Sequence, residues 1–167
     1  MLRIELLGPQ HDRDSFDCGQ PDLDDYLRRT ARQHADKGVS RTYALVDDVQ
    51  EDAILGYMTL ALCEVMPERL PVKFAKKYAH PVYGVKLARL AVRRTRQREG
   101  LGQLMMLRAM DRALAVAETA GIAGFFVDAK DRAAQQYYLR FGFLSLTDDP
   151  LRLFLPVATL KRVLEKP

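Results

Sequence analysis

The segment Lys86–Gly102 constrains the fold of this chain more than any other stretch. Its apolar run Leu87–Val92 is interrupted by Arg89, ends in a β-branched residue and predicts a buried strand. A basic turn that contains Gly100 and Gly102 follows, and a long helical pattern begins directly after it. The order of strand, basic glycine turn and helix is typical of sites where a helix N-terminus binds an anion.

The residue types in this turn indicate which anion it binds. Gly100 and Gly102 carry no Cβ atom that would block a close approach to the backbone, and the first N–H groups of a helix have no partner within it. Arg98, with Arg96 as a second candidate, adds charge-assisted hydrogen bonds. The sequence therefore predicts a cradle for a phosphate or a pyrophosphate. Two common phosphate motifs are absent, because the chain has neither G-x-x-x-x-G-K-[ST] nor G-x-G-x-x-G.

Length and composition set the class of protein. The 167 residues predict a single domain over residues 1–167 with a sizeable core. No apolar run approaches the ~20 residues of a membrane span, and the first residues lack a signal-peptide layout, so we expect a cytoplasmic protein that does not bind a membrane. Cys18 and Cys63 form neither a disulfide framework nor a zinc pattern, and the histidines are scattered, so we expect no metal.

The positive charge is unevenly distributed. The net charge is only +4, yet residues 86–98 contain six basic residues and no acidic one. A second basic group comprises Arg28, Arg29, Arg32, Lys37 and Arg41. The spacings Asp24–Arg28 and Asp25–Arg29 predict ion pairs within one helix, which gives two of these arginines local partners. Segregated basic clusters are typical of nucleic-acid binding, but a solvated surface beside cofactor phosphates has the same composition.

The hydrophobic pattern predicts an α/β (α+β) chain. Strands are expected at residues 2–7, 42–46, 54–65, 87–92, 124–127, 143–146 and 151–155, with Gly56 as a candidate bulge. Helices are expected from Pro21 to about Gly38, at 72–78, from 102 to about 120, from the capping residue Asp131 to Phe141, and at 158–164. This order predicts a mixed sheet of six or seven strands with helices on its faces.

Two motifs resemble one enzyme family. The pattern Q-x-x-G-x-G at Gln97, Gly100 and Gly102 resembles the acyl-CoA pyrophosphate loop of the GNAT superfamily of N-acetyltransferases. The segment Asp131–Phe143 is similar to the A-x-x-F-Y-x-x-x-G-F corner of that family, where Tyr138 keeps the usual tyrosine. The resemblance implies a GNAT-type, mostly antiparallel sheet with helices on both faces. It also implies an acyltransferase that uses acetyl-CoA as co-substrate.

A narrower resemblance covers nearly the whole chain. The segment Phe16–Leu27 is similar to the F-D-C-G-x-x-x-L-D-x-Y-L opening of the GNAT toxins that acetylate aminoacyl-tRNA in type II toxin–antitoxin pairs. The segments Ser40–Tyr43, Leu87–Val92, Val127–Lys130 and Leu151–Pro156 also fit. This resemblance implies a toxin that inhibits translation, with aminoacyl-tRNA as acceptor and a cognate antitoxin of ribbon-helix-helix type as partner. It leaves a homodimer open.

The resemblance assigns roles to individual residues. It implies that Tyr138 is the general acid that protonates the departing CoA sulfur, while the backbone near Val92 stabilises the oxyanion. The residues expected to bind acetyl-CoA are Leu90, Ala91, Val92, Gln97, Arg98, Glu99, Gly100, Leu101, Gly102 and Gln103. The residues expected to contact tRNA phosphates are Arg89, Arg93, Arg94, Arg96, Lys37 and Arg41.

No general base is evident in the sequence. Many family members use an acidic residue near the fourth strand, but residues 81–97 contain none, and Glu64 is the nearest candidate. A lysine amine has a pKa near ~10.4, whereas an α-amine titrates near ~7.7–8.0, so an aminoacyl ester amine needs no base to be neutral. Two alternatives stay open, namely an acetyltransferase for a protein N-terminus, lysine or small amine, and a non-catalytic CoA-fold binding module.

Overall fold

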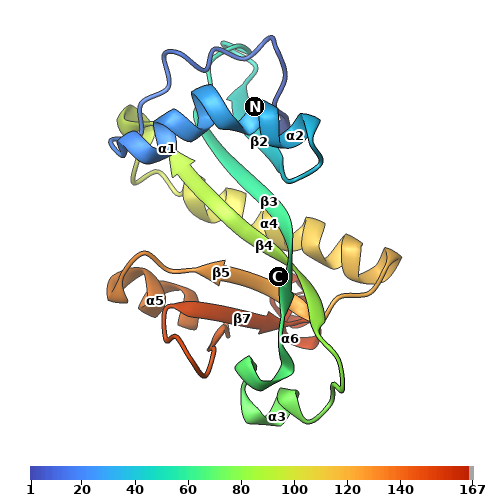
Figure 1. Cartoon of the computed structure of the whole chain (residues 1–167). Coiled ribbons are helices and arrows are strands. Elements are labelled where there is room, and N and C mark those ends of the chain that lie inside the picture. The colour runs from blue at the N-terminus through green and yellow to red at the C-terminus, as the bar shows by residue number, and fades with distance from the viewer. Residues whose placement is uncertain (166–167) are drawn as a thin grey trace. The chain divides into compact units, whose positions relative to one another are not determined.

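The computed structural model describes residues 1–165. One seven-stranded sheet has the order β1-β2-β3-β4-β5-β7-β6 (Figure 1). The strands are β1 (Leu2–Leu6), β2 (Arg41–Asp47), β3 (Gly56–Val65), β4 (Val82–Val92), β5 (Gly124–Asp128), β6 (Leu144–Ser145) and β7 (Arg152–Pro156). The helices are α1 (Pro21–Asp25), α2 (Ala31–Asp36), α3 (Val72–Ala75), α4 (Leu101–Thr119), α5 (Arg132–Leu139) and α6 (Val157–Glu165). The predicted fold class, a mixed sheet of six or seven strands, is confirmed.

The chain divides into two compact units. Unit 1 comprises residues 1–61 and 88–109, and unit 2 comprises residues 62–87 with those from 110 onward. Each unit has its own cluster of buried apolar side chains. The single domain predicted for residues 1–167 stays a prediction. Among residues 1–165, no helix is long and apolar enough to cross a bilayer.

Helices cover both faces of the strands in unit 1. β1 pairs antiparallel with β2, and β2 pairs antiparallel with β3 in a one-to-one register through Gly56. Gly56 and Tyr57 are successive, so they face opposite sides of the sheet. The Tyr57 hydroxyl donates to the Leu23 carbonyl at 2.7 Å, whereas a Cβ on Gly56 would lie 2.7 Å from Met105 Cε of α4 and 2.8 Å from the Ala91 carbonyl. Gly56 therefore permits close packing at the start of β3. The preceding Leu55 N–H donates to the carbonyl of Leu45, the residue paired with Gly56, at 2.8 Å, and the expected bulge stays a prediction.

The N-terminal helix contains a π-helical turn. α1, the π turn Tyr26–Thr30 and α2 follow one another without a break from Pro21 to Asp36, and Gly38, with φ +72°, lies just beyond the end as predicted. A π turn adds a residue to the helical repeat and so rotates the side chains that follow it. In Figure 1 this stretch lies over the strands of unit 1, with α1 and α2 at its two ends.

The ion pairs predicted for this helix are wrong. Asp24 is buried, and its Oδ1 accepts a hydrogen bond from the Cys18 N–H at 3.0 Å, so it is not a surface partner of Arg28. Arg28 Nη2 instead lies 3.6 Å from Asp25 Oδ1. The sequence could not distinguish an acidic side chain that caps a neighbouring loop from one that faces water, because both have the same spacing.

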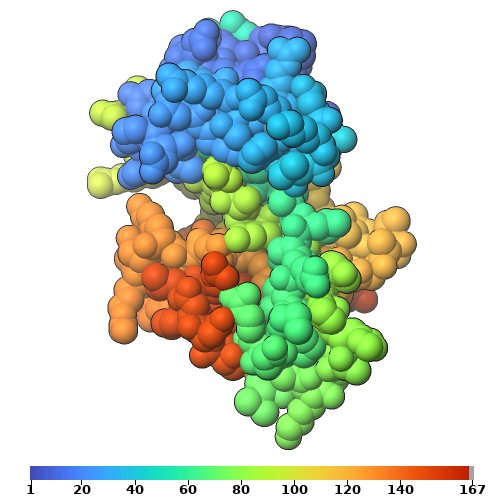
Figure 2. All heavy atoms as spheres, viewed as in Figure 1, coloured from blue at the N-terminus to red at the C-terminus, as the bar shows by residue number. Residues whose placement is uncertain are grey.

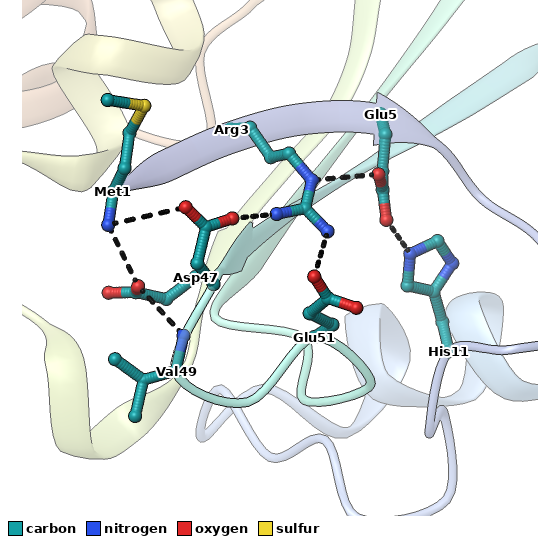
Figure 3. Close-up of polar contacts among 8 residues, drawn as sticks. Met1, Arg3, Glu5, His11, Asp47, Val49 and Glu51 are labelled. Atoms are coloured by element: carbon teal, nitrogen blue, oxygen red, sulfur yellow. Dashed lines mark hydrogen bonds and ion pairs between the residues drawn. The ribbon is translucent and has the colours of Figure 1, made fainter.

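A series of polar contacts fastens the loop after β1 (Figure 3). The buried His11 side chain donates from Nε2 to Glu5 Oε1 at 2.8 Å and accepts at Nδ1 from the Gly8 N–H at 2.9 Å, which is the pattern of a neutral imidazole. The other Glu5 oxygen accepts from Arg3 Nε at 3.1 Å. Arg3 also pairs with Asp48. Through His11, the turn that begins at Gly8 is tied to the edge strand β1.

Unit 2 repeats the two-sided arrangement. β4 and β5 pair in parallel, β5 pairs antiparallel with β7, and β7 pairs antiparallel with β6. The successive residues Phe125 and Phe126 face opposite sides. Phe126 packs 5.1 Å from Phe154, which contacts Phe74 of α3. Phe125 packs 6.0 Å from Phe143, which follows α5. Aromatic side chains therefore join the helices to both faces of these strands.

The predicted element bounds differ from the structure at several ends. Asp131 caps α5 as expected, because its Oδ1 accepts from the Ala134 N–H at 2.9 Å, but the helix ends at Leu139 rather than near residue 141. β4 begins at Val82, five residues before the predicted start at 87. The apolar pattern misses this start because Gly84 has no apolar side chain. In the structure the Phe126 ring packs against Gly84, and a Cβ there would lie 2.3 Å from that ring. Likewise, α3 ends before the predicted residue 78.

Candidate functional site

The candidate site begins where β4 leaves the sheet. The Arg93 N–H donates to the Leu55 carbonyl at 2.7 Å. Its guanidinium donates from Nε to the Ile54 carbonyl at 2.7 Å and from Nη1 to the Ser15 carbonyl at 3.2 Å. Its Nη2 is buried and has no hydrogen-bond partner within residues 1–165. Arg93 therefore ties β4 to β3 and to the loop before α1, and its guanidinium lies within the fold.

The segment after Arg93 is fastened to the loop before α1. The Arg94 N–H donates to the Asp17 carbonyl at 2.7 Å, and Arg94 Nη2 lies 3.4 Å from Asp17 Oδ1. The Gln97 side chain donates from Nε2 to the carbonyls of Cys18 at 2.9 Å and Val92 at 3.0 Å. Gln97 was predicted to bind the cofactor. That role stays a prediction, while its amide nitrogen holds the two ends of the turn together and so positions the turn.

The turn that follows is shaped for an anion. Arg98 has φ +67° and Gly100 has φ +83°, so two nearby residues adopt the left-handed conformation before α4 begins at Leu101. Alternation of right- and left-handed residues turns successive N–H groups inward and forms an anion-binding concavity. The helix dipole adds partial positive charge at the same end. The turn is thus a prepared cradle of backbone donors.

Space above the cradle supports the same interpretation. A Cβ at Gly100 would meet no atom within 4 Å, and one at Gly102 would meet only Val92 Cγ2 at 3.9 Å. No protein atom therefore requires Gly102 to be glycine, although a ligand that touches the backbone there would. These residues fit a pyrophosphate: backbone N–H groups from 98–103 would bind it, with the exposed Arg98 side chain as counter-charge.

The other residues predicted to bind acetyl-CoA have different exposures. Ala91 and Leu101 have buried side chains, so only their backbone is available to a ligand. Leu90 and Val92 are half-buried on β4. Both oxygens of Glu99 accept from Arg96 Nε, at 3.0 and 3.1 Å, which neutralises a carboxylate that would oppose an anion. The side chain of the remaining predicted residue, Gln103, is exposed.

The residues predicted to contact tRNA are not equally available. The Arg89 guanidinium lies 3.8 Å from the centre of the Tyr26 ring, over the π turn. Arg93 is engaged within the fold, and Arg94 and Arg96 each have a carboxylate partner. The last two predicted residues, Lys37 and Arg41, are exposed on unit 1. The prediction of phosphate contacts remains untested for all six.

Tyr138, the predicted general acid, lies in unit 2. It belongs to α5 and packs edge-on against Phe143 at 5.7 Å and against Tyr137 at 5.5 Å. Burial raises the pKa of the Tyr138 hydroxyl above its ordinary value, and Tyr137 adds to the effect. The phenol is therefore protonated at neutral pH, which is the state that a proton donor requires.

Sequence reasoning missed the residues that support the turn. These are backbone carbonyls of the loop before α1: that of Asp17 accepts from Arg94, that of Cys18 from Gln97 and that of Ser15 from Arg93. The F-D-C-G opening carries the signal, since the backbone carbonyls of its Asp17 and Cys18 are two of these acceptors. The motif has a local reason as well, since Phe16 is buried beside Tyr57 at 5.6 Å and anchors this loop in the core of unit 1.

Comparisons with known proteins show the family to which the chain belongs. Residues 6–143 match the model of the acetyltransferase (GNAT) family, so the chain belongs to that family of acetyltransferases. It is 33% identical over 141 residues to a tRNA-acetylating toxin of Mycobacterium tuberculosis (strain ATCC 25618 / H37Rv), covering 84% of this chain and 83% of that protein.

Two solved structures of the toxin AtaT are also similar. AtaT complexed with acetyl-methionyl-tRNAfMet has a TM-score of 0.88 and 31% identity, covering 98% of this chain and 99% of that one. A mutant of AtaT bound to acetyl-CoA and to the C-terminus of the antitoxin AtaR has a TM-score of 0.80 and 29% identity, with 99% of each chain covered.

Proposed function

We propose that this chain is an acetyl-CoA-dependent N-acetyltransferase that acetylates the α-amine of aminoacyl-tRNA and so acts as a toxin of a toxin–antitoxin pair. The observation that carries the proposal is the left-handed turn at Arg98 and Gly100, fastened by Gln97 to the F-D-C-G loop. It is supported by similarity to a tRNA-acetylating toxin and to AtaT over most of the chain.

The turn is the pyrophosphate site in this proposal. Backbone N–H groups at the start of α4 bind the diphosphate, and Arg98 adds a counter-charge. The backbone of Leu90–Val92 binds the pantetheine arm as an added strand would. When bound, acetyl-CoA supplies the activated acetyl thioester. Gln97 keeps the turn in its binding conformation because its amide bridges both sides of it.

The acceptor amine attacks without a protein base. Residues 81–97 contain no acidic side chain, and Glu99, which follows in the turn, is paired with Arg96. In this proposal no carboxylate of β4 or of the turn removes a proton from the amine. The ester of an aminoacyl-tRNA withdraws electrons from its α-amine, which lowers a pKa that is already near ~7.7–8.0. Such an amine is substantially neutral at pH 7–8. A lysine amine, with a pKa near ~10.4, is not, and this difference favours the aminoacyl acceptor.

Tyr138 completes the reaction in this proposal by protonating the CoA sulfur as the thioester breaks. Tyr138→Phe keeps the aromatic contacts with Tyr137 and Phe143 but removes the proton donor. We expect the acetyl-transfer rate to fall about 10²-fold or more while the Kd for acetyl-CoA stays unchanged. Near-native turnover in this variant would assign Tyr138 a packing role alone.

The partner expected in the cell is a cognate antitoxin of ribbon-helix-helix type. One AtaT structure contains the C-terminus of the antitoxin AtaR, and this supports an analogous partner for the present chain in the cytoplasm. Co-expression with the product of a neighbouring small gene, followed by co-purification, tests this part. A chain that accumulates in active form without slowing growth in the absence of any partner would contradict the toxin assignment.

The experiment that tests the activity is transfer of radiolabelled acetyl groups. The purified chain is incubated with labelled acetyl-CoA and total charged tRNA, with deacylated tRNA and a lysine-containing peptide as controls. We expect the label to precipitate with charged tRNA only. Mild base should then release it together with the amino acid. Label on the peptide alone would favour a protein acetyltransferase, and no label on any acceptor would favour a binding module.

A further inference from the structure

A pocket of unit 1 collects arginines that are far apart in the sequence. Its volume is about 220 Å³, and it lies between the segment after β1, the α2 helix and the start of β2. Arg13, Arg32 and Arg41 line it, one from each of these three parts of the chain. Asp36 also lines the pocket, so the ionised side chains at its wall leave two net positive charges.

In the part of the chain that the structure describes, the pocket arginines lack the ion pairs that several other arginines of unit 1 make. Arg3, Arg28, Arg94 and Arg96 each have a carboxylate within 4.0 Å. Within residues 1–165, the guanidinium groups of the pocket arginines have no such partner. Three unpaired cations around one cavity repel one another, and an anion placed among them relieves that repulsion. The arrangement thus favours a bound anion of phosphate type, which guanidinium groups recognise bidentately.

The walls of the pocket are held rigidly. His11 bonds to Glu5 of β1 (Figure 3). It also accepts from the Gly8 N–H and so ties the turn at Gly8 to this strand. The next residue, Asp12, donates its N–H to the Asp52 carbonyl at 2.8 Å, so the loop is fixed just before Arg13. The Leu7 N–H donates to the Thr42 carbonyl at 2.9 Å, and Thr42 is the neighbour of Arg41 in β2. The arginines therefore project from a fixed frame, which lowers the entropic cost of binding.

The apolar part of the lining indicates what carries the phosphate. Leu6, Leu7, Pro9, Ala31 and Ala35 contribute apolar surface between the arginines. A free inorganic anion gains nothing from such surface, whereas the sugar of a nucleic-acid backbone has an apolar face adjacent to each phosphate. Leu6 is 51% exposed and offers that surface at the edge of the sheet.

The pocket is separate from the acetyl-CoA turn. The stretch Pro21–Asp36 has its first residues beside the F-D-C-G loop that holds the turn, and its last residues line the pocket. The first pocket-lining residue of this stretch, Ala31, lies a rise of about 15 Å beyond Pro21 at ~1.5 Å per residue. In Figure 2 the N-terminal segment, in blue, forms a continuous surface along this face of unit 1. A ligand that reaches both places must be long, and an RNA strand meets this requirement.

We propose that Arg13, Arg32 and Arg41 together bind one backbone phosphate of the tRNA, at a site remote from the acetyl-CoA turn. This inference rests on the proposed function, because it takes tRNA as the substrate. Arg41 was predicted from the sequence as an outer tRNA contact, whereas Arg13 and Arg32 were not. If the three arginines share one phosphate, removing all three should lose one phosphate contact. Three independent surface contacts would lose three.

The test uses the salt dependence of tRNA binding. Each phosphate that a protein neutralises contributes roughly 0.7–0.9 to the slope of log affinity against log salt. We therefore expect the triple variant Arg13→Ala/Arg32→Ala/Arg41→Ala to flatten the slope by roughly 0.7–0.9 in total, since one phosphate is lost. Its affinity at physiological salt should fall about 10- to 100-fold. A flattening near ~2–3 would mean three separate contacts and would overturn the single-phosphate pocket.

Controls separate this inference from the proposed function. Arg29→Ala removes an exposed arginine of the same helical stretch that does not line the pocket, and it should change affinity by less than about twofold. The Kd for acetyl-CoA and the melting temperature of the triple variant should match the wild type. If wild-type protein acetylates charged tRNA and the triple variant binds it normally, the pocket inference fails and the function stands. If wild-type protein binds no tRNA, both fail.

Discussion

The two basic regions of unit 1 have similar charge but different chemistry. The arginines of the turn after β4 are close in sequence, and most are engaged: Arg93 with carbonyls, Arg94 with Asp17 and Arg96 with Glu99. The arginines of the pocket come from separate elements and have no carboxylate partner within residues 1–165. Density of charge along the chain therefore does not identify the cations that remain available to a ligand. Availability depends on which acceptors the fold brings near each guanidinium.

The largest effect expected from this comparison is on stability. Arg93→Ala removes hydrogen bonds to the Ile54 and Ser15 carbonyls and leaves these acceptors without their donors. We expect the free energy of unfolding to fall by about 2–3 kcal/mol. Arg94→Ala, the matched control in the same turn, removes an exposed pair and should cost less than about 1 kcal/mol. Urea denaturation measures both, and equal losses would contradict the division between engaged and exposed arginines.

The next effect is on acetyl-CoA affinity. Gly102→Val adds a side chain whose Cβ would lie no closer than 3.9 Å to any protein atom, so the fold accommodates it. The same side chain would occupy space that the pyrophosphate needs. We expect the Kd for acetyl-CoA to rise about tenfold or more with an unchanged melting temperature. Gly100→Val should weaken binding and also destabilise the turn, because its φ of +83° disfavours a branched side chain. Calorimetric titration that finds native affinity in folded Gly102→Val would refute the pyrophosphate cradle.

A smaller effect distinguishes the turn from the pocket in RNA binding. Arg94 is 63% exposed and its pair with Asp17 is long, so it can exchange that partner for a phosphate. Arg94→Ala should reduce tRNA affinity by about three- to tenfold and flatten the salt slope by roughly 0.7–0.9. Acetyl-CoA affinity should not change. A loss of acetyl-CoA binding with an unmoved slope would instead place Arg94 at the cofactor.

The smallest effect is the pH dependence of stability that comes from Glu5, the partner of His11 beside the pocket. The hydrogen bond from His11 is the main cause that lowers the pKa of Glu5, burial opposes it, and Arg3 adds to the lowering. A carboxylate with a lowered folded pKa stabilises the fold above its unfolded pKa, near ~4.3, and loses that contribution as the pH falls through the folded value. Glu5→Gln should therefore cost less than about 1 kcal/mol at pH 7, and the difference should shrink as the pH falls below the unfolded pKa of ~4.3. A difference that grows in acid would contradict this linkage.

The sequence predicted features that depend on neighbouring residues. The turn with Gly100 and Gly102, the Asp131 cap and the helix end at Gly38 each follow from a few adjacent residues, and the structure confirms them. The sheet class followed from strand periodicity together with a family resemblance. Local rules are sufficient where the partners of a group lie within one helical turn or one tight turn.

The features that could not be predicted depend on distant partners. Arg93 meets acceptors 39 and 78 residues away, so its engagement in the fold is invisible in the basic run where it occurs. The spacing of Asp24 and Arg28 is that of a surface ion pair. In the fold Asp24 is buried and accepts from the Cys18 N–H instead. The pocket needs Arg13, Arg32 and Arg41 at one place, and only the tertiary fold brings them together.

The most direct test of the account compares two acceptors across a range of salt concentrations. One is charged tRNA, and the other is the methyl ester of the same amino acid, which has a similar α-amine but no phosphates. The account predicts that transfer to tRNA is far more efficient at low salt and falls steeply as salt rises, while slow transfer to the ester hardly changes. Equal efficiency and equal salt dependence for both acceptors would contradict recognition through RNA phosphates.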